Sequence, residues 1–348
     1  MSEIVLEKVT KHFGALKAVD AVSFRAEKGK FVVLLGPSGC GKSTLLRLIA
    51  GLEEVDQGRI LIEGRDVTAL DPTKRRLSMV FQSYALFPHL TVEENIVFGL
   101  KVRRLPPPER KLRLERVAEL VGLTERLDHK PQQLSGGQRQ RVALARAIVS
   151  QNPICLMDEP LSNLDAQLRQ EMRVEIRALQ RRLGMTVVYV THDQVEAMSM
   201  ADHVILLRAG KIEQEGTPAE LYAQPASTFA ARFIGTPAMN LVALEDGRIR
   251  GSRETVLDGG HRGRLTLGIR PEHIRLVAEG GQKDGIRGTV TSAEYHGADT
   301  VVTARVGEES LLVRAPGQVA LASGSQVRLG WEPGALHLFD TENGMRSA

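Results

Sequence analysis

The chain has 348 residues, of which 42% are apolar and 25% charged, and its net charge is +4, as is ordinary for soluble globular proteins of two or three domains. Its basic runs are short, such as residues 74–76, and lie among acidic residues, so we expect no nucleic-acid partner. No apolar run approaches the ~18 residues of a membrane span, and residues 1–4 lack the basic-then-apolar pattern of a signal peptide.

The first 35 residues are predicted to be β-rich, with apolar runs at 4–6, 22–24 and 31–35. Phe13 lies between the first two of these runs. An aromatic side chain just upstream of a phosphate site can stack on an adenine ring, but a phenylalanine here can equally be a core or loop residue. The local pattern leaves both interpretations open.

A glycine-rich stretch follows the third run and fits the P-loop pattern G-x-x-x-x-G-K-[ST]. It lies between a predicted buried strand and a predicted helix that ends at Gly51, which is the context that the pattern requires. Glycines let backbone N–H groups close around phosphate oxygens, Lys42 can reach the β- and γ-phosphates, and the Ser43 hydroxyl can ligate Mg²⁺. The alternative, a glycine-rich turn that matches by chance, is disfavoured by this context. The motif comprises Gly36, Pro37, Ser38, Gly39, Cys40, Gly41, Lys42 and Ser43.

Residues 58–70 are predicted to form a hairpin, and residues 77–81 a strand that ends at Gln82. A glutamine at a strand end beside a phosphate site can reach Mg²⁺ and the attacking water. Most glutamines in such places instead satisfy loop backbone groups, so this signal alone is ambiguous.

Between residues 92 and 150 the hydrophobic periodicity is helical, and residues 106–108 mark a loop. The predicted apolar stripe comprises Leu112, Val117, Leu120, Val121 and Leu123.

A Leu-Ser-Gly-Gly-Gln pentapeptide follows, in which Ser135 is predicted to cap the next helix. The two glycines after it expose the N-terminal amides of that helix, which makes a second anion-binding helix start in the chain. The alternative is an ordinary capped helix.

Residues 154–157 form a predicted buried strand that ends in two acids. Asp158 is placed to hold Mg²⁺ through water, and Glu159 to polarise the water that attacks a γ-phosphate, although adjacent acids can also be solvated charges. Cys40 and Cys155 give no disulfide framework, and we expect both to be reduced.

Asp165 is predicted to cap a helix that Gly184 ends, and a strand at 186–190 leads to His192. A histidine at a strand end can donate to a γ-phosphate, but a lone histidine is more often structural.

Near residue 235 the pattern changes to short β-like runs separated by turns, which predicts a small, separate β-barrel or sandwich. Its predicted strands lie at 264–269, 301–304, 311–313, 327–329 and 335–339. It has no evident catalytic cluster.

The P-loop, the distal Leu-Ser-Gly-Gly-Gln and the apolar strand ending in Asp-Glu, in this order, resemble the ATP-binding cassette family along residues 1–235. The resemblance implies an α/β P-loop NTPase domain over 1–235 with a helical subdomain at about 88–150. An all-β, OB-like (TOBE/MOP-like) domain over 236–348 is implied to follow. ATP and Mg²⁺ are the implied cofactors.

The same resemblance implies roles for individual residues. Phe13 would stack on adenine, residues 36–43 with Thr44 would hold the phosphates, and Ser43, Gln82 and Asp158 would hold Mg²⁺. The residues implied to act in catalysis are Glu159 as base, His192 as switch histidine, Lys42 and Gln82.

In that family two cassettes pair head to tail. The resemblance therefore implies that a second copy of this chain is a partner, because each of the two anion sites in one chain is incomplete. The residues implied to close on the nucleotide of the other copy are Ser135, Gly136, Gly137 and Gln138. Hydrolysis would then remove γ-phosphate contacts and open the pair.

The C-terminal stretches 233–240 and 267–273 look like the regulatory β-domain of carbohydrate-type importer ATPases. Stretches 297–299 and 336–344 are similar to the branch that imports glycerol-3-phosphate. This implies a peripheral motor on the cytoplasmic face of the inner membrane. Its implied partners are two membrane permease subunits and, through them, an extracytoplasmic solute-binding protein.

Several alternatives stay open from sequence. The solute can be another sugar, a maltooligosaccharide, a polyamine, iron or sulfate, because the binding protein and permease select it. A non-transport cassette ATPase is disfavoured by the single cassette without a long heptad run, and a purely regulatory protein by the intact Glu159. Residues 83–89 are a candidate docking segment for the permease or, alternatively, a buried loop.

Overall fold

A computed structural model describes residues 3–257, 264–277 and 285–347, so residues 1 and 2 of the N-terminal stretch examined above lie outside it. The chain forms two compact units, Met1–Pro218 and Ala219–Ala348, and each is described separately.

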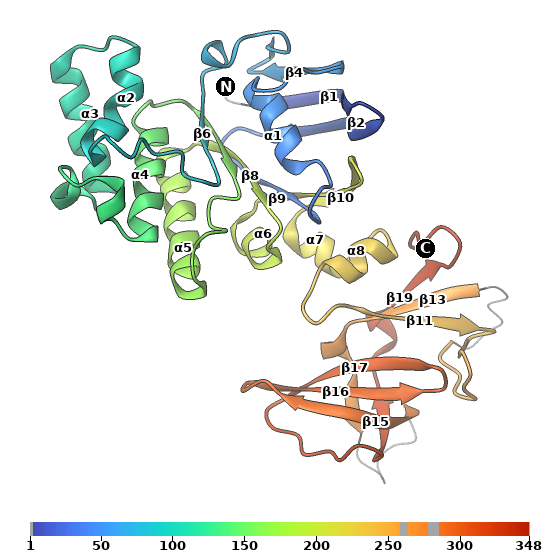
Figure 1. Cartoon of the computed structure of the whole chain (residues 1–348). Coiled ribbons are helices and arrows are strands. Elements are labelled where there is room, and N and C mark those ends of the chain that lie inside the picture. The colour runs from blue at the N-terminus through green and yellow to red at the C-terminus, as the bar shows by residue number, and fades with distance from the viewer. Residues whose placement is uncertain (1–2, 258–263, 278–284, 348) are drawn as a thin grey trace. The chain divides into compact units, whose positions relative to one another are not determined.

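A six-stranded sheet organises the first unit, in the order β10-β9-β3-β8-β7-β6 (Figure 1). The strands β3, β9, β8, β7 and β6 are parallel, and β10 joins β9 as an antiparallel edge strand. The three central strands are buried at every position, as expected for a sheet covered on both faces. The strands span Phe31–Leu35 (β3), Leu77–Val80 (β6), Ile154–Asp158 (β7), Thr186–Thr191 (β8), His203–Arg208 (β9) and Lys211–Gly216 (β10).

A second, antiparallel sheet has the order β2-β1-β4-β5 and contains the predicted hairpin, which pairs Leu61 with Asp66 and Ile62 with Arg65. The helix α1 (Lys42–Ala50) contributes Leu45, Leu46, Leu48 and Ile49 to the core that both sheets share. It ends at Gly51 in the left-handed conformation, as predicted. The strands span Ile4–Phe13 (β1), Leu16–Ala26 (β2), Gln57–Ile62 (β4) and Arg65–Asp66 (β5).

Three helices form the predicted helical region: α2 (Val92–Val102), α3 (Pro107–Leu120) and α4 (Gly136–Ile148). The prediction of Leu112 in its apolar stripe is wrong, because 67% of Leu112 is exposed and Leu114 is buried instead. The spacing of Leu114, Val117 and Val121 by three and four keeps them on one helix face, whereas Leu112 precedes Val117 by five. Residues 107 and 108 begin α3, because proline fits the first turn of a helix.

The helix predicted after Asp165 is present. It is α5 (Ala166–Leu183): the Asp165 side chain caps it by accepting from the Leu168 amide, and Gly184 follows its last residue. The short helix α6 (Gln194–Met200) begins at Asp193, directly after His192.

Two antiparallel sheets make up most of the second unit, in the orders β12-β11-β13-β19 and β14-β18-β15-β16-β17. All five predicted strands are present, and the alternation of buried and intermediate residues along β16 agrees with a one-sided core. The strands β11, β12, β14 and β15 were not predicted from the sequence. The strands span Asn240–Glu245 (β11), Arg248–Ile249 (β12), Arg264–Ile269 (β13), Arg275–Val277 (β14), Ile286–Tyr295 (β15), Asp299–Val306 (β16), Glu309–Pro316 (β17), Gln326–Gly330 (β18) and Leu336–Asp340 (β19).

The helices α7 (Pro218–Ala223) and α8 (Thr228–Phe233) precede these sheets. Arg270, which is 1% exposed, ties them to the sheets: it donates to the carbonyls of Tyr222 and Ile234, and its guanidinium lies over the Tyr222 ring. We still propose that the β-fold of the second unit begins after residue 235.

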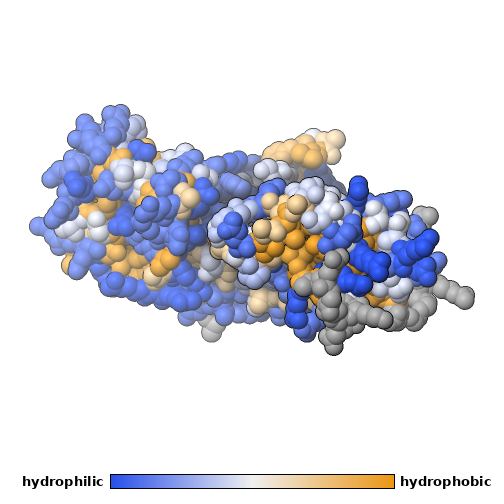
Figure 2. All heavy atoms as spheres, turned by 90° about the horizontal axis from the view of Figure 1, so that it is seen from below, coloured by the Kyte–Doolittle hydropathy of each residue, from blue (hydrophilic) through white to orange (hydrophobic). Residues whose placement is uncertain are grey.

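Hydrophilic side chains cover most of the face shown in Figure 2, with apolar side chains in small groups among them. None of the helices in the described ranges is long and apolar enough to cross a membrane.

Candidate active site

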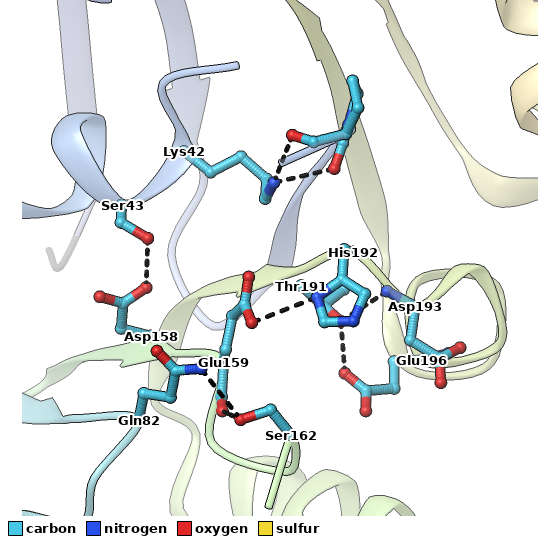
Figure 3. Close-up of polar contacts among 12 residues, drawn as sticks. Lys42, Ser43, Gln82, Asp158, Glu159, Ser162, Thr191, His192, Asp193 and Glu196 are labelled. Atoms are coloured by element: carbon cyan, nitrogen blue, oxygen red, sulfur yellow. Dashed lines mark hydrogen bonds and ion pairs between the residues drawn. The ribbon is translucent and has the colours of Figure 1, made fainter. Parts of the chain in front are cut away.

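Most of the predicted site residues follow the ends of parallel strands. The P-loop follows β3, Gln82 lies just beyond β6, Asp158 ends β7, and His192 follows β8. Because the carboxyl ends of parallel strands meet at one edge of a sheet, these residues gather there (Figure 3).

The P-loop backbone requires glycine where it passes closest to neighbouring backbone carbonyls. Gly41 has a φ of 102°, and a Cβ atom there would lie 2.2 Å from the Ala18 carbonyl oxygen. A Cβ on Gly36 would lie 2.4 Å from the Leu207 carbonyl oxygen. The loop is therefore packed against its own domain on one side, which fixes the course of the backbone toward α1.

Lys42 is a buried cation, only 5% exposed. Its Nζ donates to the carbonyls of Gly36 at 2.8 Å and Pro37 at 2.9 Å, and no carboxylate pairs with it among the described residues. A buried ammonium without a counter-charge is costly. This loop therefore fits an anion such as a nucleotide phosphate.

Ser43 and Asp158 come together although 115 positions separate them: the Ser43 hydroxyl donates to Asp158 Oδ1 at 2.7 Å. A hydroxyl and a carboxylate oxygen are hard ligands that suit Mg²⁺. Magnesium is usually held by one or two protein groups together with phosphates and water.

Glu159 adopts a left-handed backbone conformation, with a φ of 42°, and its amide donates to the Val190 carbonyl on the neighbouring strand. A non-glycine residue in this region is strained and needs support from its surroundings. The side chain points to His192, with 3.2 Å between Glu159 Oε2 and His192 Nδ1. The predicted base and switch histidine are thus in direct contact.

Gln82 lies beside this pair. Its Nε2 donates to the Ser162 hydroxyl at 3.3 Å, and its backbone carbonyl accepts from the Asn163 side chain at 2.9 Å. Ser162 in turn donates to the Glu159 carbonyl at 2.9 Å. The glutamine is therefore joined to the acid through the segment that precedes α5.

Phe13 ends β1 and is 48% exposed, so the interpretation of Phe13 as a core residue is wrong. Lys11 Nζ lies 5.4 Å from the centre of its ring. An exposed aromatic face upstream of the P-loop is compatible with stacking on a nucleobase.

Ser135, Gly136, Gly137 and Gln138 begin α4. The Ser135 hydroxyl accepts from the Gln138 amide at 3.3 Å and the Gln138 side chain from the Ser135 amide at 2.9 Å, which confirms the predicted cap. Within the described ranges, no hydrogen bond or ion pair joins them to the residues in Figure 3. The structure of one chain therefore leaves this pentapeptide apart from the P-loop.

Sequence reasoning missed a group of residues behind His192. Glu196 is 3% exposed, and burial raises the pKa of its carboxyl. Tyr189, Thr191 and Arg169 belong to the same network, described below. The sequence signal for this group is an acidic residue, Glu196, four positions after His192.

The family comparisons divide the chain as the fold does. Residues 19–162 match a family model described as ABC transporter, and residues 267–339 match one described as TOBE domain.

Relatives are similar over the full length. A protein of Cereibacter sphaeroides named sn-glycerol-3-phosphate import ATP-binding protein UgpC is 47% identical over 99% of this chain and 100% of that protein. A protein of Agrobacterium fabrum named sulfoquinovosyl glycerol transport ATP-binding protein SmoE is 45% identical over 98% of each chain. Among solved structures, a dimeric bacterial ABC transporter cassette, MJ0796, is 34% identical and superposes with a TM-score of 0.56, covering 62% of this chain and 98% of that one.

Proposed function

This chain belongs to the family of ATP-binding proteins of ABC transporters, and from that premise we propose that it is the ATP-hydrolysing motor of an importer for sn-glycerol-3-phosphate or a related sugar. The solute class is supported by sequence identity of 47% to proteins named for sn-glycerol-3-phosphate import. This similarity extends over the whole chain, including the β-domain. The observation that carries hydrolysis is the contact of Glu159 and His192 beside Lys42, Ser43 and Asp158.

The residues at the strand ends have distinct roles in this proposal. The P-loop amides and Lys42 bind the phosphates, and Phe13 supports the adenine. Ser43, Gln82 and Asp158 hold Mg²⁺, which when bound neutralises charge on the β- and γ-phosphates. Glu159 accepts a proton from the attacking water, and His192 both orients Glu159 and faces the γ-phosphate.

A second copy of this chain completes each site. The amides of Gly136, which is half-buried, and of Gly137, which is buried, belong to the first turn of α4, where backbone N–H groups can bind an anion. We therefore place them on the nucleotide of the partner copy, and two ATP molecules hold the dimer. Support comes from the dimeric cassette named above.

The permease docks on residues 83–89, the docking segment. Arg146 donates to the carbonyls of Tyr84 and Ala85, and Asn95 bonds the amide and the carbonyl of Phe87. The backbone is thus held on both sides of Leu86. Since Gln82 lies next to this segment, movement of the permease would reach the site. The motor then sits peripherally on the cytoplasmic face of the membrane, and an extracytoplasmic binding protein delivers the solute.

The second candidate solute is sulfoquinovosyl glycerol or a similar glycoside. A relative named for the transport of that compound is 45% identical to this chain, close to the 47% of the glycerol-3-phosphate relative. The two solutes share a glycerol unit and a strong anionic group.

The test is uptake of labelled glycerol-3-phosphate by cells that lack this gene, complemented with the wild-type chain or with Glu159→Gln. We expect only the wild type to restore uptake, because the amide cannot accept the proton. If neither chain restores uptake, glycerol-3-phosphate is excluded as the solute, and labelled glycosides would be tested next. Uptake restored by both would show that Glu159 is not the essential base.

A further inference from the structure

His192 lies on a three-residue segment, residues 191–193, that runs from the last residue of β8 to the residue that caps α6; we call it the switch turn. Its side chain is 56% exposed, and its described polar contact is with Glu159. A side chain this exposed is oriented only if the backbone that carries it is fixed. The following contacts fix that backbone from both sides of His192.

The C-terminal side of the turn is anchored by charge. Asp193 caps α6, where its Oδ1 accepts from the Val195 and Glu196 amides. Arg169 of α5 donates to Asp193 Oδ2 at 3.3 Å and, with its other terminal nitrogen, to the Leu164 carbonyl at 3.0 Å.

The N-terminal side is anchored by Glu196. The Thr191 hydroxyl donates to Glu196 Oε2 at 2.6 Å and accepts from the Asp193 amide at 2.9 Å, so it spans His192. Figure 3 shows this bond between Thr191 and Glu196. The Tyr189 hydroxyl donates to the same carboxylate oxygen at 2.9 Å.

Glu196 is 3% exposed, and in the part of the chain that the structure describes no Lys, Arg or His forms an ion pair with it. Its Oε2 instead accepts from the Thr191 and Tyr189 hydroxyls. A buried carboxylate is tolerated when hydrogen bonds satisfy it, and here those bonds come from the strand end that carries His192.

We propose that Glu196 is a positioning residue for hydrolysis: through Thr191 it fixes the switch turn, and so holds the His192 imidazole against Glu159. This inference rests on the proposed function. It predicts that Glu196 acts on catalysis only through His192 and leaves ATP binding unchanged.

The test measures kcat and the Kd for ATP in the full chain. Thr191→Val removes the hydroxyl at constant shape, and Glu196→Leu removes the acceptor. We expect each to lower kcat about ten-fold or more with the Kd for ATP within about two-fold. Glu196→Gln keeps an oxygen that both hydroxyls can reach and should retain most of kcat. Tyr189→Phe keeps Glu196 and its bond to Thr191 and is the matched control.

A double-mutant cycle separates positioning from general damage. In a His192→Ala background, Thr191→Val and Glu196→Leu should cause no further loss of kcat. Equal fold-losses with and without His192 would overturn the proposal. Because Thr191→Val is isosteric, the test survives if Glu196→Leu does not fold.

A readout that needs no activity distinguishes this proposal from the proposed function. The ¹⁵N resonances of the His192 ring should shift in Thr191→Val and Glu196→Leu and stay unchanged in Tyr189→Phe. Unchanged His192 resonances in all three variants would overturn the positioning role even if the chain hydrolyses ATP. A wild-type chain with ordered resonances but no ATPase activity would instead overturn the proposed function.

Discussion

Cys40 shows how one residue can belong to a binding loop and yet be shielded. It is 3% exposed, and its sulfur lies 3.8 Å from Lys42 Nζ. Burial raises the pKa of the Cys40 thiol, although the nearby Lys42 charge partly opposes the shift. Cys155, in β7, is also buried, and its pKa is raised to about 12. The thiolate is the reactive form, so both should react slowly in the folded chain.

We predict that a maleimide modifies Cys40 at least about ten-fold more slowly than an exposed cysteine, and that bound ATP slows it further. The modified chain should not bind ATP, because the added group occupies the phosphate loop. Mass spectrometry of modified peptides and ATPase assays measure both effects, with Cys40→Ala as control. Full activity after complete modification of Cys40 would contradict the prediction.

His337, in β19, carries a pH dependence. It is 8% exposed, and its Nδ1 has no partner within the described ranges. Burial, aided by the charges of Arg346, Arg270 and His273, lowers the pKa of His337 to about 4. In the unfolded chain His337 is protonated below about pH 6.5, whereas in the folded chain it stays neutral down to about pH 4. The free energy of unfolding therefore falls as the pH drops from about 6.5 to 4.

Between pH 7.5 and 5.0 this difference corresponds to a loss of about 2 kcal/mol in the free energy of unfolding of the second unit. His337→Gln should lack this part of the loss. Urea unfolding followed by Trp331 fluorescence measures it, because Trp331 is the one tryptophan of the sequence and packs against the core of this unit. An equal loss in variant and wild type would show that His337 is not the group responsible.

At the scale of an element, the docking segment is a loop whose shape depends on helices on either side. Arg146 of α4 holds Tyr84 and Ala85, which have φ values of 63° and 47°, and Asn95 of α2 holds Phe87. Phe87 packs on Phe98, with 4.5 Å between the ring centres. Of residues 83–89 only Tyr84 is buried, Leu86 and Phe87 are half-buried and the other four are exposed, so the alternative of a buried loop is wrong.

We predict that Leu86→Asp abolishes most uptake while leaving the Kd for ATP and the melting temperature close to wild type, because a charge at a half-buried apolar contact blocks docking of a permease helix. Leu112→Asp is the matched control, since Leu112 is 67% exposed on α3. Uptake assays with circular dichroism of both variants test this. Wild-type uptake by Leu86→Asp would remove the docking role.

At the scale of the whole molecule, the P-loop cluster and the capped start of α4 share no hydrogen bond or ion pair among the described residues, and we propose that each is half of a nucleotide site. Two copies arranged head to tail would complete both. Nucleotide then controls association, because each ATP joins surfaces of two chains.

We predict that Glu159→Gln forms an ATP-dependent dimer that persists, since hydrolysis no longer removes the γ-phosphate. Ser135→Arg in the same background should prevent dimer formation, because the longer, charged side chain fills the space against the nucleotide. Light scattering coupled to gel filtration, with and without ATP, measures the mass. A dimer that forms equally well without ATP, or despite Ser135→Arg, would contradict the arrangement.

Features that depend on neighbouring residues could be predicted from the order of amino acids alone. The P-loop between a buried strand and a helix, the caps at Ser135 and Asp165, and the acids that end a strand are local patterns, and the structure has each of them. From these, with the similarity of motifs, the cassette and β-domain folds could be predicted. Parallel strands place their carboxyl ends at one edge, so even the meeting of Asp158 and Ser43 follows from local order.

Which faces are covered and which distant groups meet depends on the packing of the whole fold. Leu112 faces solvent and Leu114 the core, Phe13 is exposed, and Glu196 lies buried beneath His192. The missed strand β15 pairs with β16 across a short turn and with β18, which lies far along the chain. The physical reason is that burial and hydrogen bonding depend on neighbours far away along the chain, whereas helix periods, caps and loop glycines depend on residues a few positions apart.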